Sequence, residues 1–132
     1  MQTFLPIDDF KKSVQCLDYR RLGKQRVECL QIFNALTGKS KAWVNHPATR
    51  MWAGYEDALC EYWDECVKEW VRRKYLNAMS VPLYSPNPIK PSWFGEEKLH
   101  SSHRAALLYK DINWYSQFNW DEIPELNYWW PV

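Results

Sequence analysis

The longest apolar stripe in this sequence has the spacing of an α-helix. Between residues 47 and 75 it comprises Trp52, Tyr55, Leu59, Tyr62, Trp63, Cys66, Trp70 and Val71. Side chains that recur every three or four positions lie on one side of a helix. The other side carries opposite charges four residues apart, Asp64–Lys68 and Glu69–Arg73, which are typical of a solvated face. We therefore predict one long helix from Pro47 to about Tyr75, with an aromatic face on the core.

Three further segments carry helix signals. Asp8 and Asp9 are candidate N-caps of a short helix that ends near Cys16. Asp18 is a candidate N-cap of a longer helix, which Gly38 should end; its apolar stripe is Leu22, Cys29, Leu30, Phe33 and Leu36. A last helix is expected over residues 96–110. The fold class predicted is therefore all-α, a small single-domain helical bundle over residues 1–132.

Two segments should not be regular. Residues 79–95 are rich in proline and are expected to form an irregular crossing loop. The tail from residue 112 to residue 132 is rich in aromatic residues and is expected to wrap the core. Most of the nine tryptophans should be core residues, while a few could form a stacking platform for a nucleobase.

Composition limits the partners and the compartment. The formal net charge is +1, so any contact with nucleic acid must use a local basic patch. Cys16, Cys29, Cys60 and Cys66 form no CxxC pair and read as reduced thiols. The sequence shows no secretion signal and no apolar run long enough to span a membrane. We therefore expect a cytoplasmic protein without a membrane partner, and no cofactor.

The most informative polar stripe lies on the helix expected after Asp18. It consists of Arg21, Lys24, Gln25 and Glu28, with Arg20 and Arg26 beside it. One interpretation is a solvated charged face with a Lys24–Glu28 pair. The other is an anion site in which several cations surround one carboxylate that acts as an acid–base group.

Later segments add further candidates for ligand binding. His46 and Arg50 lie at the helix start marked by Pro47, where His46 is either a cap or an anion ligand. His100 and His103 share one helix face, with Arg104 next to them. These three side chains form either a surface patch or part of an anion site. No third metal ligand has a recognisable spacing, so no metal site is predicted.

The sequence resembles the pyrimidine-dimer DNA glycosylase (endonuclease V) family. The resemblance is carried by the run "LD…RVE…NAL.GK.KAWVNHP…W" and a long helix ending "EWVRRKY". It covers roughly residues 15–75. The "LGKQRVE" and "NHP" segments are also similar to those of uncharacterised bacterial and phage proteins.

The resemblance implies a small helical DNA glycosylase and lyase for damaged or modified bases. It assigns the essential glutamate to Glu28. In this family the nucleophile is the α-amine of a small residue that is exposed when the initiator methionine is removed. Here Gln2 follows Met1, and a large second residue normally keeps the methionine in place. The free amine would then belong to Met1.

Two functions from different classes remain open from the sequence. The first is an enzyme that excises bases from DNA. The second is a non-catalytic module on the same scaffold that binds a small nucleotide, for example a signalling nucleotide. In both, the arginines would hold phosphates and aromatic side chains would stack on a base. A third possibility is an interaction protein with a charged surface.

Overall fold

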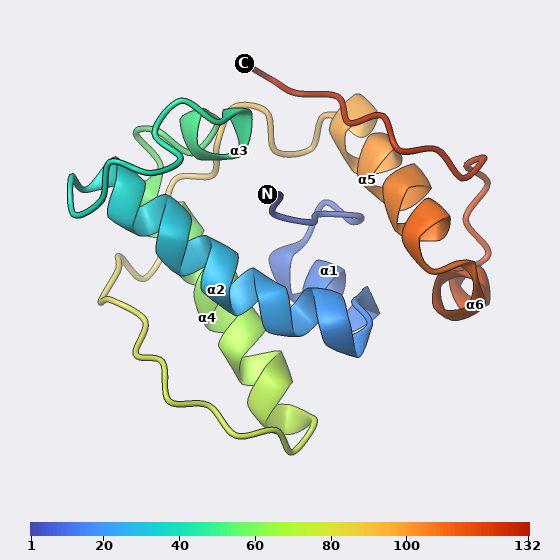
Figure 1. The fold of residues 1–132 in the computed structure, drawn as a ribbon, viewed down its shortest axis with the longest axis horizontal. Helices are drawn as coiled ribbons and strands as arrows, with labels where there is room; N and C mark the ends of the chain where they lie inside the picture. Colours follow the sequence, from blue (N-terminus) through green and yellow to red (C-terminus); the bar gives the residue numbers. More distant parts are fainter.

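The computed structural model describes all 132 residues, and its regular elements are all helices (Figure 1). This confirms the all-α prediction. The elements are α1 (Phe10–Cys16), α2 (Tyr19–Leu36), α3 (Pro47–Arg50), α4 (Glu56–Arg72), α5 (Glu97–Lys110), α6 (Ile112–Tyr115) and a 3-10 turn, η1 (Ser116–Phe118). No helix is both long and apolar enough to span a membrane.

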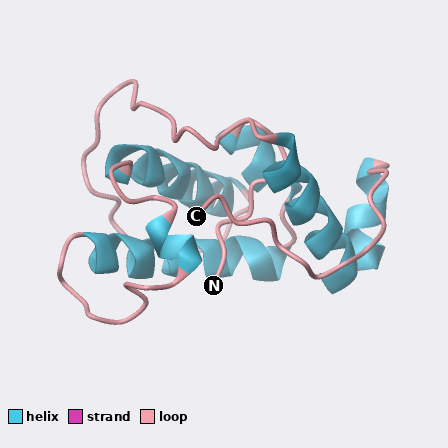
Figure 2. Ribbon diagram, turned by 90° about the horizontal axis from the view of Figure 1, so that it is seen from above, coloured by secondary structure: helices cyan, strands magenta, loops and turns pink.

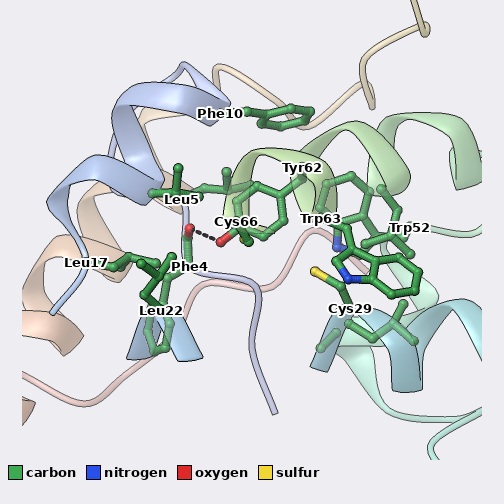
Figure 3. Close-up of a cluster of buried hydrophobic side chains, with 14 of the residues drawn as sticks. Phe4, Leu5, Phe10, Leu17, Leu22, Cys29, Trp52, Tyr62, Trp63 and Cys66 are labelled. Atoms are coloured by element: carbon green, nitrogen blue, oxygen red, sulfur yellow. Dashed lines mark hydrogen bonds between the residues drawn. The ribbon is translucent and has the colours of Figure 1, made fainter. Parts of the chain in front are cut away.

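Helices α2 and α4 cross and share the most extensive helix–helix contact, while α1 packs on α4. The aromatic face predicted for the long helix is buried: Tyr62 and Trp63 are at most 1% exposed. They pack with the fully buried Trp52 and with side chains of the N-terminal segment (Figure 3). In the view of Figure 1 the N-terminus lies near the middle of the molecule, between α2 and α5, and seen from above it lies at one edge of the helices (Figure 2).

The prediction of one helix from Pro47 to Tyr75 is wrong, because the chain turns between Met51 and Tyr55. Gly54 has φ +84°, a left-handed conformation that glycine adopts without steric cost. A helix cannot continue through that conformation. The chain therefore forms the short helix α3, a turn, and then α4.

Two of the predicted boundaries are confirmed by their geometry. The Asp9 side chain accepts a hydrogen bond of 2.7 Å from the Lys12 N–H and caps α1. Gly38, at φ +80°, ends α2, and the Lys39 N–H donates back to the Asn34 carbonyl at 2.9 Å. That bond closes the C-terminal turn in the Schellman pattern.

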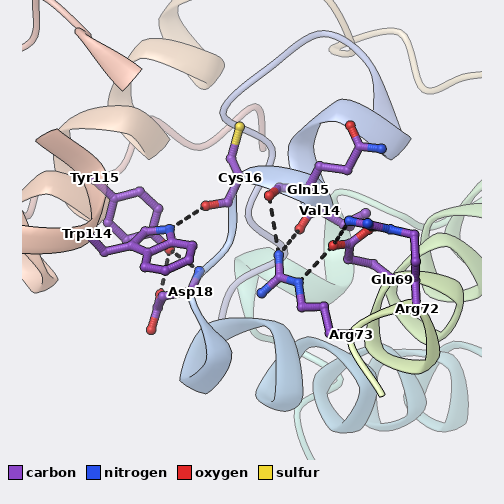
Figure 4. A network of polar contacts seen from close by, with 9 residues as sticks. All are labelled: Val14, Gln15, Cys16, Asp18, Glu69, Arg72, Arg73, Trp114 and Tyr115. Atoms are coloured by element: carbon purple, nitrogen blue, oxygen red, sulfur yellow. Dashed lines mark hydrogen bonds and ion pairs between the residues drawn. The ribbon is translucent and has the colours of Figure 1, made fainter. Parts of the chain in front are cut away.

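Asp18 precedes α2 as predicted, but its side chain makes no capping hydrogen bond. Its carboxylate instead accepts from the Tyr115 hydroxyl at 2.5 Å (Figure 4). It also accepts from Arg21 at 3.1 Å. Asp18 therefore joins the start of α2 to α6, which lies almost a hundred residues later in the chain.

The outer face of α4 also differs from the prediction. Glu69 was expected to be solvated, but it is 4% exposed and pairs with both Arg72 and Arg73. Arg73 also donates to the carbonyls of Val14 and Gln15, which ties α4 to α1 (Figure 4). Val71, predicted to face inward, is 51% exposed.

The two irregular segments lie on different sides of this framework. The proline-rich loop is held against α4, where Tyr84 donates to Asp64 and Ser85 donates to Asp57. The C-terminal tail runs alongside α5 (Figure 1), and the Trp129 N–H donates to Ser102.

Candidate active site

The N-terminal segment is buried although it is neither helix nor strand. Residues 2–6 are all buried and run between α2 and α5 (Figure 1). A buried backbone must find partners for its N–H and C=O groups, since each unpaired group costs free energy. Side chains from three helices supply most of these partners, while the Thr3 N–H donates to the side chain of Gln2.

Gln25 of α2 and Tyr62 of α4 hold the first part of this segment. Gln25 Oε1 accepts from the Phe4 N–H at 2.8 Å, and Gln25 Nε2 donates to the Gln2 carbonyl at 2.9 Å. The Tyr62 hydroxyl lies 2.7 Å from the Phe4 carbonyl oxygen (Figure 3). The second proton on Gln25 Nε2 is donated to Glu28 at 2.7 Å. One buried amide therefore fixes both the N-terminal segment and the carboxylate of Glu28.

Helix α5 holds Leu5 through two histidines in opposite tautomers. His103 Nδ1 accepts from the Leu5 N–H at 2.9 Å, so the proton of its neutral ring is on Nε2. His100 Nε2 accepts from the Gly95 N–H, so its Nδ1 carries a proton and donates to the Leu5 carbonyl at 2.6 Å. Arg104 donates to the next carbonyl, that of Pro6, at 2.8 Å.

The buried state of His103 predicts a loss of stability in acid. Burial, together with His100 and Arg104, lowers the pKa of His103 from 6.5 to about 3. The unfolded chain binds this proton more readily, so the stabilisation present above about pH 6.5 is lost as the pH falls toward about 3. From about pH 7 to about pH 4 this group should remove about 3 kcal/mol of unfolding free energy.

The measurement is urea unfolding as a function of pH, for wild type and for His103→Asn. Asparagine keeps an acceptor near the Leu5 N–H and does not titrate. The variant should be less stable at neutral pH but should show a flatter acid limb. Identical slopes in both proteins would contradict this assignment.

The first residue of the N-terminal segment, Met1, lies at a pocket of about 710 Å³. This volume is within the range of small-molecule and nucleotide sites. Met1 and Glu28 both line it, as do residues of α2, α4, α5 and the C-terminal tail. Glu28 therefore lies in a concave site and not on an open, solvated helix face.

Glu28 is the single acidic side chain in the pocket lining. Burial raises the pKa of its carboxyl, while the Met1 amino group and Lys24 act to lower it. The Glu28 charge in turn contributes to a raised pKa of about 12 for Tyr128, whose main cause is burial. Glu28 thus lies within electrostatic range of both the Met1 amino group and Tyr128.

Cations and aromatic rings make up much of the remaining lining. The cations are Arg20, Arg21, Lys24 and Lys110. Tyr19 stacks on Trp70 with ring centroids 5.5 Å apart, and Phe4 meets Tyr128 edge to face at 6.1 Å. A pocket with one carboxylate, several cations and exposed ring surface suits a ligand that has both phosphate groups and a planar base.

Four of the predicted ligand-binding and catalytic positions on α2 meet Met1 in this pocket: Arg20, Arg21, Lys24 and Glu28. Arg26 is on the same helix but outside the lining. Its guanidinium lies 4.3 Å from the Trp70 ring and donates to Asn77. Its contacts order Trp70 and the chain that follows α4.

The other predicted ligand-binding residues do not line the pocket. His46 caps α3 by accepting from the Ala48 N–H at 3.0 Å, and Arg50 is exposed. His100 and His103 hold Leu5, as described above. Arg104 pairs with Glu97 and Glu122. Two further residues line the pocket that the sequence did not indicate: Lys110 of α5 and Tyr128 of the C-terminal tail. Both lie more than eighty positions after α2 begins, and no local spacing pattern indicates a contact over that separation.

Comparison with known proteins gives one family match. A family model described as pyrimidine dimer DNA glycosylase matches residues 1–83. No curated protein and no solved structure matches the chain. The matched stretch includes the N-terminal segment, α2 and α4, and therefore most of the pocket wall. Because it covers more than half of the sequence, the chain belongs to the pyrimidine dimer DNA glycosylase family.

Proposed function

We propose that this protein is a DNA glycosylase with lyase activity that acts on a damaged or modified base, with the α-amine of Met1 as nucleophile and Glu28 as the acid–base residue. The observation that carries the proposal is that the start of the chain and Glu28 line one pocket. Gln25 holds both, through the Gln2 carbonyl and the Glu28 carboxylate. The target nucleotide would leave the duplex and enter this pocket.

The first chemical step exchanges one C1′–N bond for another. The unprotonated amine attacks C1′ of the sugar, and the bond to the base breaks. The base leaves with the bonding electron pair and takes up a proton. The attached nitrogen loses a proton, and its lone pair then expels O4′, which is protonated by Glu28. The product is an imine between the protein and the opened sugar.

The second step breaks the strand. The carboxylate of Glu28 removes a proton from C2′, and the electron pair expels the 3′-phosphate. Water then hydrolyses the imine and releases the amine. The raised pKa of Glu28 suits this role, because its carboxyl can hold a proton closer to neutral pH and give it up again. Arg20, Arg21, Lys24 and Lys110 would hold the flanking phosphates.

Borohydride trapping on DNA with an abasic site tests this proposal. Borohydride reduces an imine to a stable amine, so we expect a covalent complex. Peptide mapping should place the sugar on the α-nitrogen of Met1. The pocket contains two other amines, those of Lys24 and Lys110. Lys24→Arg and Lys110→Arg keep the charge and remove the amine, and the attachment point should remain Met1 in both variants.

Two outcomes would overturn the proposal. Attachment to a lysine would assign the nucleophile to another residue. Absence of any trapped complex, combined with tight binding of a free nucleotide, would favour the non-catalytic nucleotide-binding function. A thermal-shift screen against a nucleotide panel reads out that second function, because a ligand at a hundredfold its Kd adds about 2.7 kcal/mol to stability.

A further inference from the structure

We propose that the loop between α2 and α3 carries a wedge for duplex DNA, in which Trp43 enters the base stack beside the nucleotide drawn into the pocket. This inference rests on the proposed function, because it takes DNA as the partner. Apolar side chains that enter between base steps unstack and kink a duplex, and the energy is recovered through added contacts. Four observations support the assignment.

The tip of this loop exposes large apolar side chains. Trp43 is 47% exposed and Val44 is 41% exposed. Lys39 and Lys41 are exposed just before them. An exposed indole next to cations combines a ring that can stack on a base with charges that contact phosphates.

Trp43 is held in an unusual backbone conformation. Its φ is +67°, in the left-handed region that a bulky side chain rarely adopts. Its carbonyl accepts from the His46 N–H at 3.1 Å, and the Ala42 N–H donates to Ser40 Oγ at 3.1 Å. Backbone strain that the surrounding structure maintains is frequently found at functional positions. Here it presents an indole at the tip of a fixed turn.

A row of rings connects Trp43 to the pocket. The ring centroids are 5.9 Å apart for Trp43 and His46, 5.8 Å for His46 and Trp130, and 5.5 Å for Trp130 and Tyr128. Tyr128 lines the pocket. The Met1 amino charge also contributes to lowering the pKa of His46, after burial, so the proposed nucleophile lies within electrostatic range of the base of this loop.

Acidic and basic residues are concentrated in different segments of the chain, which suits binding to duplex DNA. Residues 19–55 contain one acidic side chain, Glu28, and seven cations: Arg20, Arg21, Lys24, Arg26, Lys39, Lys41 and Arg50. Helix α4 has the opposite balance, with six acidic residues and two cations. A near-neutral protein can thus present a basic face to a phosphate backbone and repel it elsewhere.

The test compares Trp43→Ala with wild type on a duplex that contains a tetrahydrofuran abasic analogue, which cannot form an imine, opposite 2-aminopurine. Wild type should raise 2-aminopurine fluorescence, because the probe is unstacked. Trp43→Ala should lose this signal and bind the duplex at least about tenfold more weakly, as expected when one stacking ring is removed. Trp43→Phe should restore most of both effects.

Two controls separate the wedge from folding and from the chemistry. Trp43→Gly should give the same loss of signal without a loss of thermal stability, since glycine adopts φ +67° freely. Leu83→Ala removes a fully exposed apolar side chain from the loop beside α4 and should behave as wild type. Trapping on single-stranded abasic DNA should persist in Trp43→Ala, because a single strand has no duplex stack to open.

An unchanged duplex affinity in Trp43→Ala would overturn the proposal, as would an equal loss on single-stranded and duplex DNA. The failure of the proposed function has a different signature. In that case wild type is not trapped on single-stranded abasic DNA, whereas the fluorescence and affinity of the uncleavable duplex report on the wedge without any catalysis.

Discussion

Glu28→Gln should slow strand cleavage at an abasic site by about 10²–10⁴-fold, the usual contribution of a positioned acid–base group. Glutamine has nearly the same shape and can still accept the hydrogen bond from Gln25 Nε2. It cannot protonate O4′ or remove the C2′ proton. The measurement is single-turnover cleavage of an abasic duplex, with the enzyme in excess.

A matched control is Glu65→Gln. Glu65 is also half-buried and its pKa is also raised by burial, but it lies on α4 outside the pocket lining. This variant should cleave at the wild-type rate. Equal losses in both variants, or cleavage at the wild-type rate by Glu28→Gln, would remove Glu28 from the proposed mechanism.

The direction of the Glu28 pKa shift separates this effect from unfolding. A carboxyl whose pKa is raised in the folded state stabilises the protein fully below its unfolded pKa, and that contribution is lost as the pH rises. At neutral pH the buried charge of Glu28 therefore costs stability. Glu28→Gln should be as stable as wild type or more stable, so its loss of activity would come from the chemistry.

Gln25→Leu should lower the free energy of unfolding by about 2–6 kcal/mol. The change leaves the Phe4 N–H and the Gln2 carbonyl buried without their partner, and each unpaired group costs about 1–3 kcal/mol. It also releases the start of the chain from Glu28, so trapping at Met1 should fall in protein that remains folded. Urea unfolding and the yield of the trapped complex measure the two effects.

The control for Gln25→Leu is a second glutamine-to-leucine substitution on α2, Gln31→Leu. Gln31 is half-buried on α2 and its side chain makes no hydrogen bond with the protein. Gln31→Leu should therefore stay within about 0.5 kcal/mol of wild type, as substitutions away from special contacts usually do. A similar loss in both variants would show that leucine disturbs α2 itself, and not the support of the N-terminal segment.

Local signals in the sequence determined the helices and one side of the pocket. The Asp9 cap, Gly38 and Pro47 depend on interactions between residues a few positions apart, so they could be predicted. The grouping of Arg21, Lys24 and Glu28 follows from the 3.6-residue period of one helix. The turn at Gly54 was missed, although the glycine was visible, because the aromatic stripe continued on both sides of it.

Only the tertiary structure decided what the buried polar groups do. Gln25 and Glu28 belong to the same polar stripe on α2, yet Gln25 is fully buried and Glu28 reaches a pocket. His100 and His103 suggested a ligand site from their spacing, but they hold Leu5, which lies more than ninety positions earlier in the chain. An extended buried segment must satisfy its backbone hydrogen bonds from whichever side chains the topology brings near it. That requirement, which no local pattern encodes, places the start of the chain beside Glu28.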